Sequence, residues 1–116
     1  MTQPLNNQTR PFEMGFYNFV DSGTNPLTGE KKDPAVVMKN MLEVIELADQ
    51  IGLDVFAIGE HHRVEYLASA PEVILGAAAA RTKNIRLSTA VTVLSSDDPV
   101  RVFQRFATVD LISNGR

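Results

Sequence analysis

The chain lacks cysteine, has only two histidines and contains no long apolar run. Without cysteine, disulfides and thiolate metal sites are excluded, as in proteins of a reducing compartment. No apolar stretch reaches the roughly 18 residues needed to span a membrane. Residues 1–11 have the composition of a polar lead-in rather than of a signal peptide. The expected location is therefore the cytoplasm.

The chain also lacks an excess of positive charge, since its net charge is −3. This gives no reason to expect a nucleic acid or an anionic membrane surface as a partner. With 116 residues, of which 44% are hydrophobic and 22% charged, the composition is that of one modest globular domain.

Three segments have the composition of strands. Residues 12–20 are apolar and aromatic, residues 54–58 form a short apolar run, and residues 85–94 are dense in β-branched side chains. Because residues 85–94 are almost continuously apolar, this strand is expected to be buried on both faces.

Three helices are predicted between and after these strands. Asp-Pro pairs at 33–34 and 98–99 begin the first and the third, since aspartate caps free backbone N–H groups and proline fits the first turn. The second helix is predicted over residues 72–82, where Ser69 and Glu72 have the spacing of a capping box.

The first and third helices are expected to bury broad apolar faces. In the first, the apolar residues recur at helical spacing and are Val37, Met41, Val44, Ile45, Ala48 and Ile51. Asp49 falls on its polar face, and Gly52 ends it. In the third, the apolar residues are Val102, Phe103, Phe106, Ala107, Val109, Leu111 and Ile112. Asp110 lies on that apolar stripe, where a carboxylate needs a partner, predicted to be an arginine.

The alternation of strands and helices with short connections predicts right-handed βαβ units around a parallel sheet, an α/β fold. A (β/α)8 TIM barrel needs about 250 residues. We therefore expect residues 1–116 to be the first three β/α units of such a barrel. The alternative is a small complete α/β domain that pairs its free sheet edge with a second copy.

Glu60, His61 and His62 end the apolar run of the second strand and include both histidines of the chain. In parallel α/β folds, functional groups gather at the carboxyl ends of strands. A histidine there can donate or accept a proton near neutral pH, and Glu60 can fix the tautomer of an imidazole. The competing interpretation is an ordinary solvated loop. A metal site is disfavoured, because adjacent residues point to opposite faces and no further histidine exists.

Two aromatic residues and one stretch of small residues have structural as well as functional interpretations. Tyr17 and Phe19 share a strand face, where they either pack in the core or form the floor of a flat ligand site. Residues 76–80 are small and lie mid-helix, which favours close helix packing over phosphate binding.

Four stretches, in this order, resemble the N-terminal part of the bacterial-luciferase-like flavin-dependent monooxygenase family. They are Ala-Asp-Gln-Ile-Gly-Leu-Asp-Val-Phe-Ala-Ile-Gly-Glu-His-His at 48–62, Ala-Ala-Ala-Arg-Thr-Lys-Asn-Ile-Arg-Leu-Ser-Thr-Ala at 78–90, Asp-Pro-Val-Arg at 98–101 and Asp-Leu-Ile-Ser-Asn-Gly-Arg at 110–116. The resemblance spans residues 13–116 and implies a TIM barrel that uses reduced FMN and oxygen to oxidise a small organic substrate.

The resemblance also implies roles for individual residues. His61 corresponds to the acid/base histidine, with Glu60 as a second catalytic candidate in the polar mouth. Thr89, Ala90 and Val91 would back the flavin ring, with a non-proline cis peptide at Ala90-Val91.

Partners and rival functions follow from the same resemblance. A separate flavin reductase is expected, as is a homodimer formed through helices 71–82 and 99–112. The rivals are a deazaflavin (F420) oxidoreductase, a non-catalytic flavin-binding protein and a self-associating structural fragment. Because the flavin-phosphate site of the family lies largely in later barrel units, the 116-residue chain is expected to bind flavin weakly or not at all and to be inactive alone.

Overall fold

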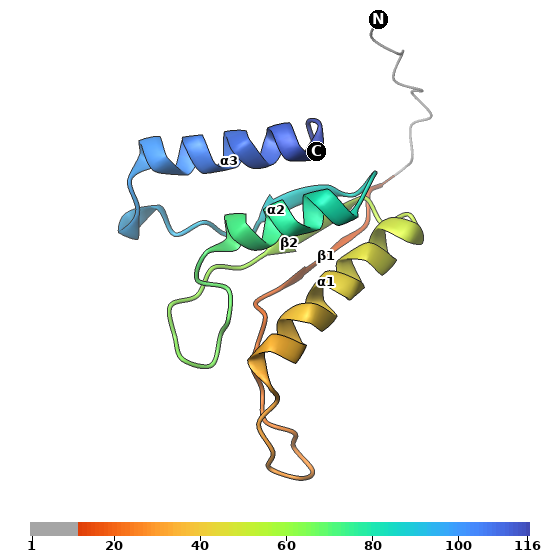
Figure 1. Ribbon diagram of the computed structural model, residues 1–116, viewed down its shortest axis with the longest axis vertical. Helices are drawn as coiled ribbons and strands as arrows, with labels where there is room; N and C mark the ends of the chain where they lie inside the picture. The colour runs from red at the N-terminus through yellow and green to blue at the C-terminus, as the bar shows by residue number, and fades with distance from the viewer. Residues whose placement is uncertain (1–11) are drawn as a thin grey trace, which may run out of the picture.

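The computed structural model describes residues 12–116, so the predicted lead-in at 1–11 lies outside the described residues. The elements are β1 (Gly15–Asn18), α1 (Pro34–Gln50), β2 (Val55–Ile58), α2 (Pro71–Arg81), β3 (Arg86–Thr89), a short 3-10 turn η1 (Leu94–Ser96) and α3 (Pro99–Ser113). The predicted alternation of parallel strands and helices is confirmed (Figure 1). No helix within residues 12–116 is long and apolar enough to cross a membrane.

The three strands form one parallel sheet in the order β1-β2-β3. Phe16, Phe56 and Leu87 lie in register on the face that carries the hydrophobic core. Side chains from all three helices join this core and include Met41, Ile45, Ile74, Leu75, Ala78 and Val109. The alternate residues Tyr17 and Ser88 point to the other face and are exposed. All helices therefore cover the same face of the sheet, and the other face is open.

The local signals for the helix starts are correct at two of three places. Asp33 accepts a hydrogen bond from the backbone N–H of Ala35 at 2.8 Å, and Asp98 accepts two from Val100 and Arg101. The capping box of the second helix is wrong, because Ala70 occupies the cap position and makes no side-chain bond.

The strands are shorter than the apolar runs that predicted them. The first covers 15–18 rather than 12–20, and the third covers 86–89 rather than 85–94. After Thr89 the chain leaves the sheet and turns at 94–96. The third strand is not buried on both faces, since exposed and half-buried residues alternate along it. It lies at the edge of the sheet with its second face open, which explains the difference.

Asp49 was expected on the polar face of α1 but is buried, with 9% of its surface exposed. Its carboxylate accepts three backbone hydrogen bonds, from Lys83 at 2.9 Å and from Asn84 and Ile85 at 2.7 Å each. Asp110, which was predicted to be the carboxylate in need of a partner, is exposed instead. A buried carboxylate therefore lies on α1, where it anchors the connection between α2 and β3.

Arg116 completes this anchor. Its guanidinium donates hydrogen bonds to the carbonyl oxygens of Ala79 and Thr82, which are left free at the end of α2. Its own backbone carbonyl accepts a hydrogen bond from the N–H of Leu87 on β3 at 2.9 Å. Residue 116 therefore lies beside the free edge of the sheet.

The outer flanks of α1 and α3 carry apolar side chains that no described element covers. On α1, Val36, Val44, Leu47 and Ile51 are exposed, so two residues of its predicted buried face, Val44 and Ile51, lie outside the core. On α3, Phe103, Leu111 and Ile112 are exposed, again against expectation. Each helix packs on the sheet and toward α2, which leaves its opposite flank unpartnered.

Candidate active site

The carboxyl ends of the three strands lie next to one another and form the C-terminal edge of the sheet, which is distinct from its free lateral edge along β3. The loops after β1 and β2 extend beyond this C-terminal edge (Figure 1). The backbone N–H of Gly59 donates to the carbonyl of Asn18 at 3.0 Å, and that of Ala90 donates to Ile58 at 2.9 Å. The residues that follow the strands are thereby held next to one another.

Glu60 is nearly buried, with 8% of its side chain exposed. One carboxylate oxygen accepts a hydrogen bond from the backbone N–H of Val93 at 2.7 Å. The other lies 2.5 Å from Nε2 of His62. In this contact an ionised Glu60 accepts a hydrogen bond from the protonated Nε2 of His62. Glu60 therefore orients His62, as the sequence suggested for one of the two imidazoles.

His61 lies in an aromatic cluster instead. Its ring stacks on Tyr66 with centroids 4.4 Å apart and planes 18° from parallel, and the edge contact with Phe19 measures 4.7 Å. Its backbone N–H donates to the carbonyl of Ala68. Within residues 12–116, neither ring nitrogen of His61 forms a hydrogen bond, so both are available to a bound molecule.

The two histidines therefore have different surroundings, as expected from the alternation of neighbouring side chains. His62 is half-exposed and pairs with Glu60, whereas His61 stacks on Tyr66. The described residues include no group of three or more His, Cys, Asp or Glu side chains that could hold a metal ion.

Close packing under this edge leaves Gly59 no room for a side chain. A Cβ atom at Gly59 would lie 2.2 Å from ring carbons of Phe19 and 3.2 Å from the carbonyl oxygen of Ala90. Next to Phe19, Val20 has a positive φ of 53°, which is rare for a β-branched residue. Such strain costs about 1–3 kcal/mol and is commonest at functional sites. The N–H of Val20 is held by Asn18 at 2.6 Å.

The segment after β3 contains a cis peptide bond between Ala90 and Val91, where the family resemblance implied one. The segment is held from β2, because the N–H of Glu60 donates to the carbonyl of Val91 at 3.3 Å. Thr89 lies in register with buried Ile58 and bonds through its hydroxyl to Thr92 at 2.8 Å. Its side chain is thus directed toward the helices, so only the backbone of Thr89 faces the open side.

Several residues of this edge were missed or misjudged from the sequence. Tyr66 is one of only two tyrosines and follows the histidine pair in a polar loop, which is the one signal that could have singled it out. Tyr17 does not pack in the core, since it is 58% exposed and meets Phe19 edge-on at 5.3 Å. Val93 contributes only its backbone N–H, which no sequence pattern reveals.

This edge suits the ring of a flavin better than its phosphate. Tyr17, on the open face of the sheet, is 58% exposed and presents aromatic surface on which a flat ring can lie. Two arginines that follow these strands are paired with carboxylates, Arg63 with Glu65 and Arg105 with Glu72 and Asp97. The described residues therefore fit the ring-binding half of such a site better than its phosphate-binding half.

Comparisons with known proteins point the same way. The family model described as luciferase-like monooxygenase matches residues 13–116. The chain is 36% identical over 93 residues to 4-hydroxyprotoasukamycin monooxygenase of Streptomyces nodosus subsp. asukaensis, a match that covers 79% of this chain and 25% of the relative. It is 34% identical over 77 residues to the oxygenase component of the flavin-dependent trigonelline monooxygenase of Acinetobacter baylyi, covering 66% and 21%.

A solved structure shares the fold. It is the oxygenating constituent of 3,6-diketocamphane monooxygenase from Pseudomonas putida in complex with FMN, with a TM-score of 0.75 and 22% identity. The match covers 89% of this chain and 27% of that one. The chain thus spans about a quarter of the length of the proteins it matches.

Proposed function

Because the chain belongs to the luciferase-like monooxygenase family, we propose that it forms the N-terminal part of a flavin-dependent monooxygenase that acts on a small organic substrate. The observation that carries the proposal is the position of His61. Its ring is oriented by Tyr66 and Phe19, free at both nitrogens within residues 12–116, and placed at the strand edge that also carries the Ala90-Val91 cis peptide.

We further propose that the three units belong to a TIM barrel. Strands in sequential order with every helix on one face are the arrangement of a barrel, whereas a doubly wound sheet has helices on both faces. The open sheet face corresponds to the barrel interior. The exposed flanks of α1 and α3 correspond to the surfaces on which neighbouring helices of the barrel would pack. The hydrogen bond from the N–H of Leu87 to the carbonyl of Arg116 lies at the lateral edge of the sheet, where a fourth strand would pair.

The residues of this chain have distinct roles in the proposed reaction. The flavin, when bound, supplies the electrons that activate oxygen. His61 would hold or transfer a proton at one of its imidazole nitrogens. The backbone of residues 89–91 would support the flavin ring, and Tyr17 and Phe19 would exclude water from one side of it.

FMN and a separate reductase are the proposed cofactor and partner. One neighbour in structure was solved with FMN, and one relative is the oxygenase component of a flavin-dependent enzyme. An enzyme that receives its flavin already reduced needs no nicotinamide site of its own. The reductase is therefore expected to be another protein.

Flavin binding tests the proposal. The full-length protein of which this chain is the proposed N-terminal part (the longer protein) is expected to bind FMN at micromolar concentration in a fluorescence titration. The 116-residue chain is expected to bind at least about 10-fold more weakly, because each lost charge-assisted bond to a phosphate costs more than a factor of ten. Micromolar binding by the chain alone would contradict the proposal that residues outside this chain bind the flavin phosphate.

Turnover separates the proposed activity from its rivals. With reduced FMN and oxygen, the longer protein is expected to form an oxygenated product. Rapid reoxidation of reduced FMN without such a product would indicate a non-catalytic flavin-binding protein. Activity with F420 in place of FMN would indicate a deazaflavin oxidoreductase.

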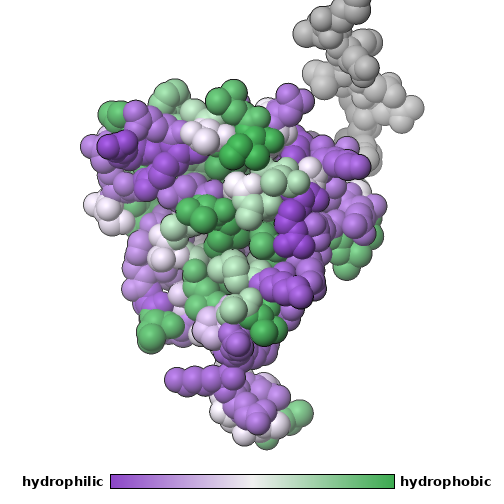
Figure 2. All heavy atoms as spheres, viewed as in Figure 1, coloured by the Kyte–Doolittle hydropathy of each residue, from purple (hydrophilic) through white to green (hydrophobic). Residues whose placement is uncertain are grey.

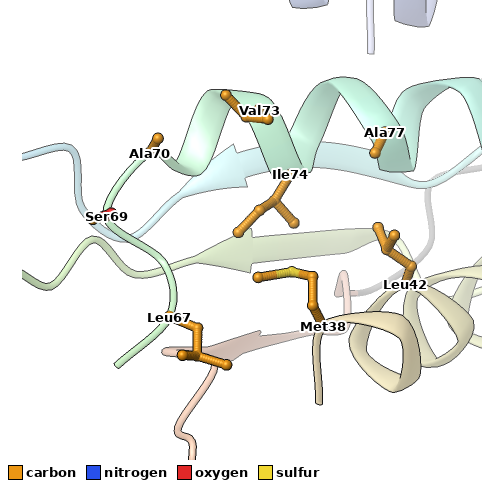
Figure 3. Close-up of a pocket in the computed structure, with 8 residues that line it drawn as sticks. All are labelled: Met38, Leu42, Leu67, Ser69, Ala70, Val73, Ile74 and Ala77. Atoms are coloured by element: carbon orange, nitrogen blue, oxygen red, sulfur yellow. The ribbon is translucent and has the colours of Figure 1, made fainter. Parts of the chain in front are cut away.

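We also propose a homodimer formed through α2 and α3. An apolar groove of about 290 Å³ lies between α1 and α2, where Met38 and Leu42 of α1 face Ile74 and Ala77 of α2 (Figure 3). A second groove of about 350 Å³ lies between α2 and α3, beside Val73, Gly76 and Ile112. Figure 2 shows hydrophobic residues gathered along the middle of this face, bordered by hydrophilic ones. A helix pair of a second copy would fill such paired grooves.

Val73→Glu tests the dimer, because Val73 lines both grooves and is 68% exposed. A charge buried there without a partner should weaken association by at least about 30-fold. Light scattering is expected to show a dimer for the unaltered protein and a monomer for the variant. Val64→Glu, at a residue 95% exposed, is the matched control and should stay dimeric. A monomeric unaltered protein would contradict the proposal.

A further inference from the structure

The structure points to a positioning role for Glu60. We propose that its carboxylate holds the segment 90–93 in the place where the cofactor ring binds and does not itself move a proton. The expected effect on flavin binding rests on the proposed function, whereas the contacts between Glu60 and the segment 90–93 do not depend on any cofactor.

Glu60 contacts this segment at two points. Its backbone N–H donates to the carbonyl of Val91 at 3.3 Å, and its side chain accepts from the N–H of Val93 at 2.7 Å. The two bonds bracket Thr92, whose hydroxyl is bonded to that of Thr89. The segment with the Ala90-Val91 peptide is thus tied to the end of β2 largely by one residue.

Both carboxylate oxygens of Glu60 are occupied. One takes the Val93 N–H and the other faces His62, and only 8% of the side chain is exposed. A buried carboxylate that accepts a backbone N–H is a strong orienting group, because charge-assisted hydrogen bonds are short and stable. A group that exchanges protons with a substrate needs a free hydrogen-bonding atom, which His61 has within residues 12–116 and Glu60 lacks.

Glutamine separates the two roles. Its amide oxygen can accept from the Val93 N–H, and its NH2 group can donate to a neutral His62 ring. Glu60→Gln therefore keeps both side-chain contacts and removes the charge, whereas Glu60→Ala removes both side-chain contacts and leaves the backbone bond to Val91 in place. The matched control is Glu65→Ala, because Glu65 lies on the same loop and pairs with the exposed Arg63.

Amide hydrogen exchange is the first measurement and needs no cofactor. In Glu60→Ala, exchange at Val93 is expected to rise more than about 10-fold, because a hydrogen bond to a charged acceptor is lost. Exchange at Ile45, in the core of α1, should stay within about 3-fold. Glu60→Gln and Glu65→Ala should leave Val93 protected. The inference is overturned if Val93 stays protected in Glu60→Ala, or if Ile45 and Val93 rise by the same factor.

Flavin affinity and turnover of the longer protein are the second measurement. Glu60→Ala should weaken FMN binding at least about 10-fold, and Glu60→Gln should stay within about 3-fold and retain turnover. If Glu60→Gln binds FMN normally but loses turnover as fully as Glu60→Ala, the charge matters for proton transfer and the inference fails. If the unaltered protein binds no flavin, the proposed function fails. The exchange rate at Val93 still tests whether the Glu60 carboxylate holds the segment 90–93.

Discussion

Replacing His61 with alanine in the longer protein is expected to lower turnover by at least about 100-fold while FMN affinity stays within about 3-fold, since general acid/base groups typically contribute factors of 10²–10⁴. The reason lies in the surroundings of the ring. Its stacking on Tyr66 fixes the plane of the imidazole, and both nitrogens are free within residues 12–116. The measurement is the rate of product formation with reduced FMN supplied, together with a flavin titration.

Two further variants make this result specific. Arg63→Ala removes an exposed side chain two residues away, 70% of which is in solvent, and should leave the rate unchanged. Tyr66→Phe keeps the aromatic stack and should retain most activity, whereas Tyr66→Leu should lower turnover because the ring of His61 is less well oriented. Unchanged turnover in His61→Ala would remove His61 from the mechanism.

The largest effect on stability is expected at Asp49. Asp49→Ala leaves three backbone N–H groups without their acceptor and Arg116 without a nearby carboxylate. Removing one partner of such a buried group costs about 3 kcal/mol or more in the free energy of unfolding. Asp49→Asn keeps an oxygen for Asn84 and Ile85 but not for Lys83, and should cost about 1–2 kcal/mol. Urea denaturation at pH 7 measures both.

The control for Asp49 is Glu43→Ala on the same helix. Glu43 pairs with Lys39 at 3.9 Å, and both side chains are more than half exposed. Exposed pairs at this spacing are worth about 0.3–0.5 kcal/mol, so the control should be nearly neutral. Equal losses in the free energy of unfolding for Asp49→Ala and Glu43→Ala would show that the buried carboxylate stabilises the fold no more than an exposed ion pair does.

The stabilisation by Asp49 should also depend on pH. Burial by itself raises the pKa of Asp49, but the N–H groups of Ile85, Lys83 and Asn84, aided by the Arg116 charge, hold the pKa below its ordinary value of 3.8. A carboxyl with a lowered folded pKa stabilises the fold above its unfolded pKa and loses that contribution as the pH falls through the folded value. The stability gap to Asp49→Asn should therefore shrink between about pH 5 and pH 2. A gap that does not change with pH would contradict this assignment.

Local chemistry was predictable where its partners are close in sequence. The caps at Asp33 and Asp98 bond to backbone groups two or three residues ahead, so the residue types alone determine them. The same holds for Gly52, whose φ of 81° ends α1 as a left-handed turn. The order of strands and helices also follows from hydrophobic periodicity, which depends on near neighbours.

Contacts across the fold were not predictable in this way. Asp49 looked polar and exposed on a helical wheel, because its partners lie 34 to 36 residues further along the chain. Asp110 looked buried for the converse reason, since periodicity identifies an apolar stripe but not whether another element covers it. The exposed Phe103 and Ile51 illustrate the same limit.

The sequence by itself determined that a carboxylate and two histidines follow a buried strand of a parallel α/β fold, and its motifs identified the family. Only the tertiary structure decided which groups each of these three side chains contacts. Glu60 turns toward Val93 and His62, and His61 stacks on Tyr66. The physical reason is that neighbouring side chains alternate in direction, while the groups they meet come from other strands and loops, whose distances no local pattern encodes.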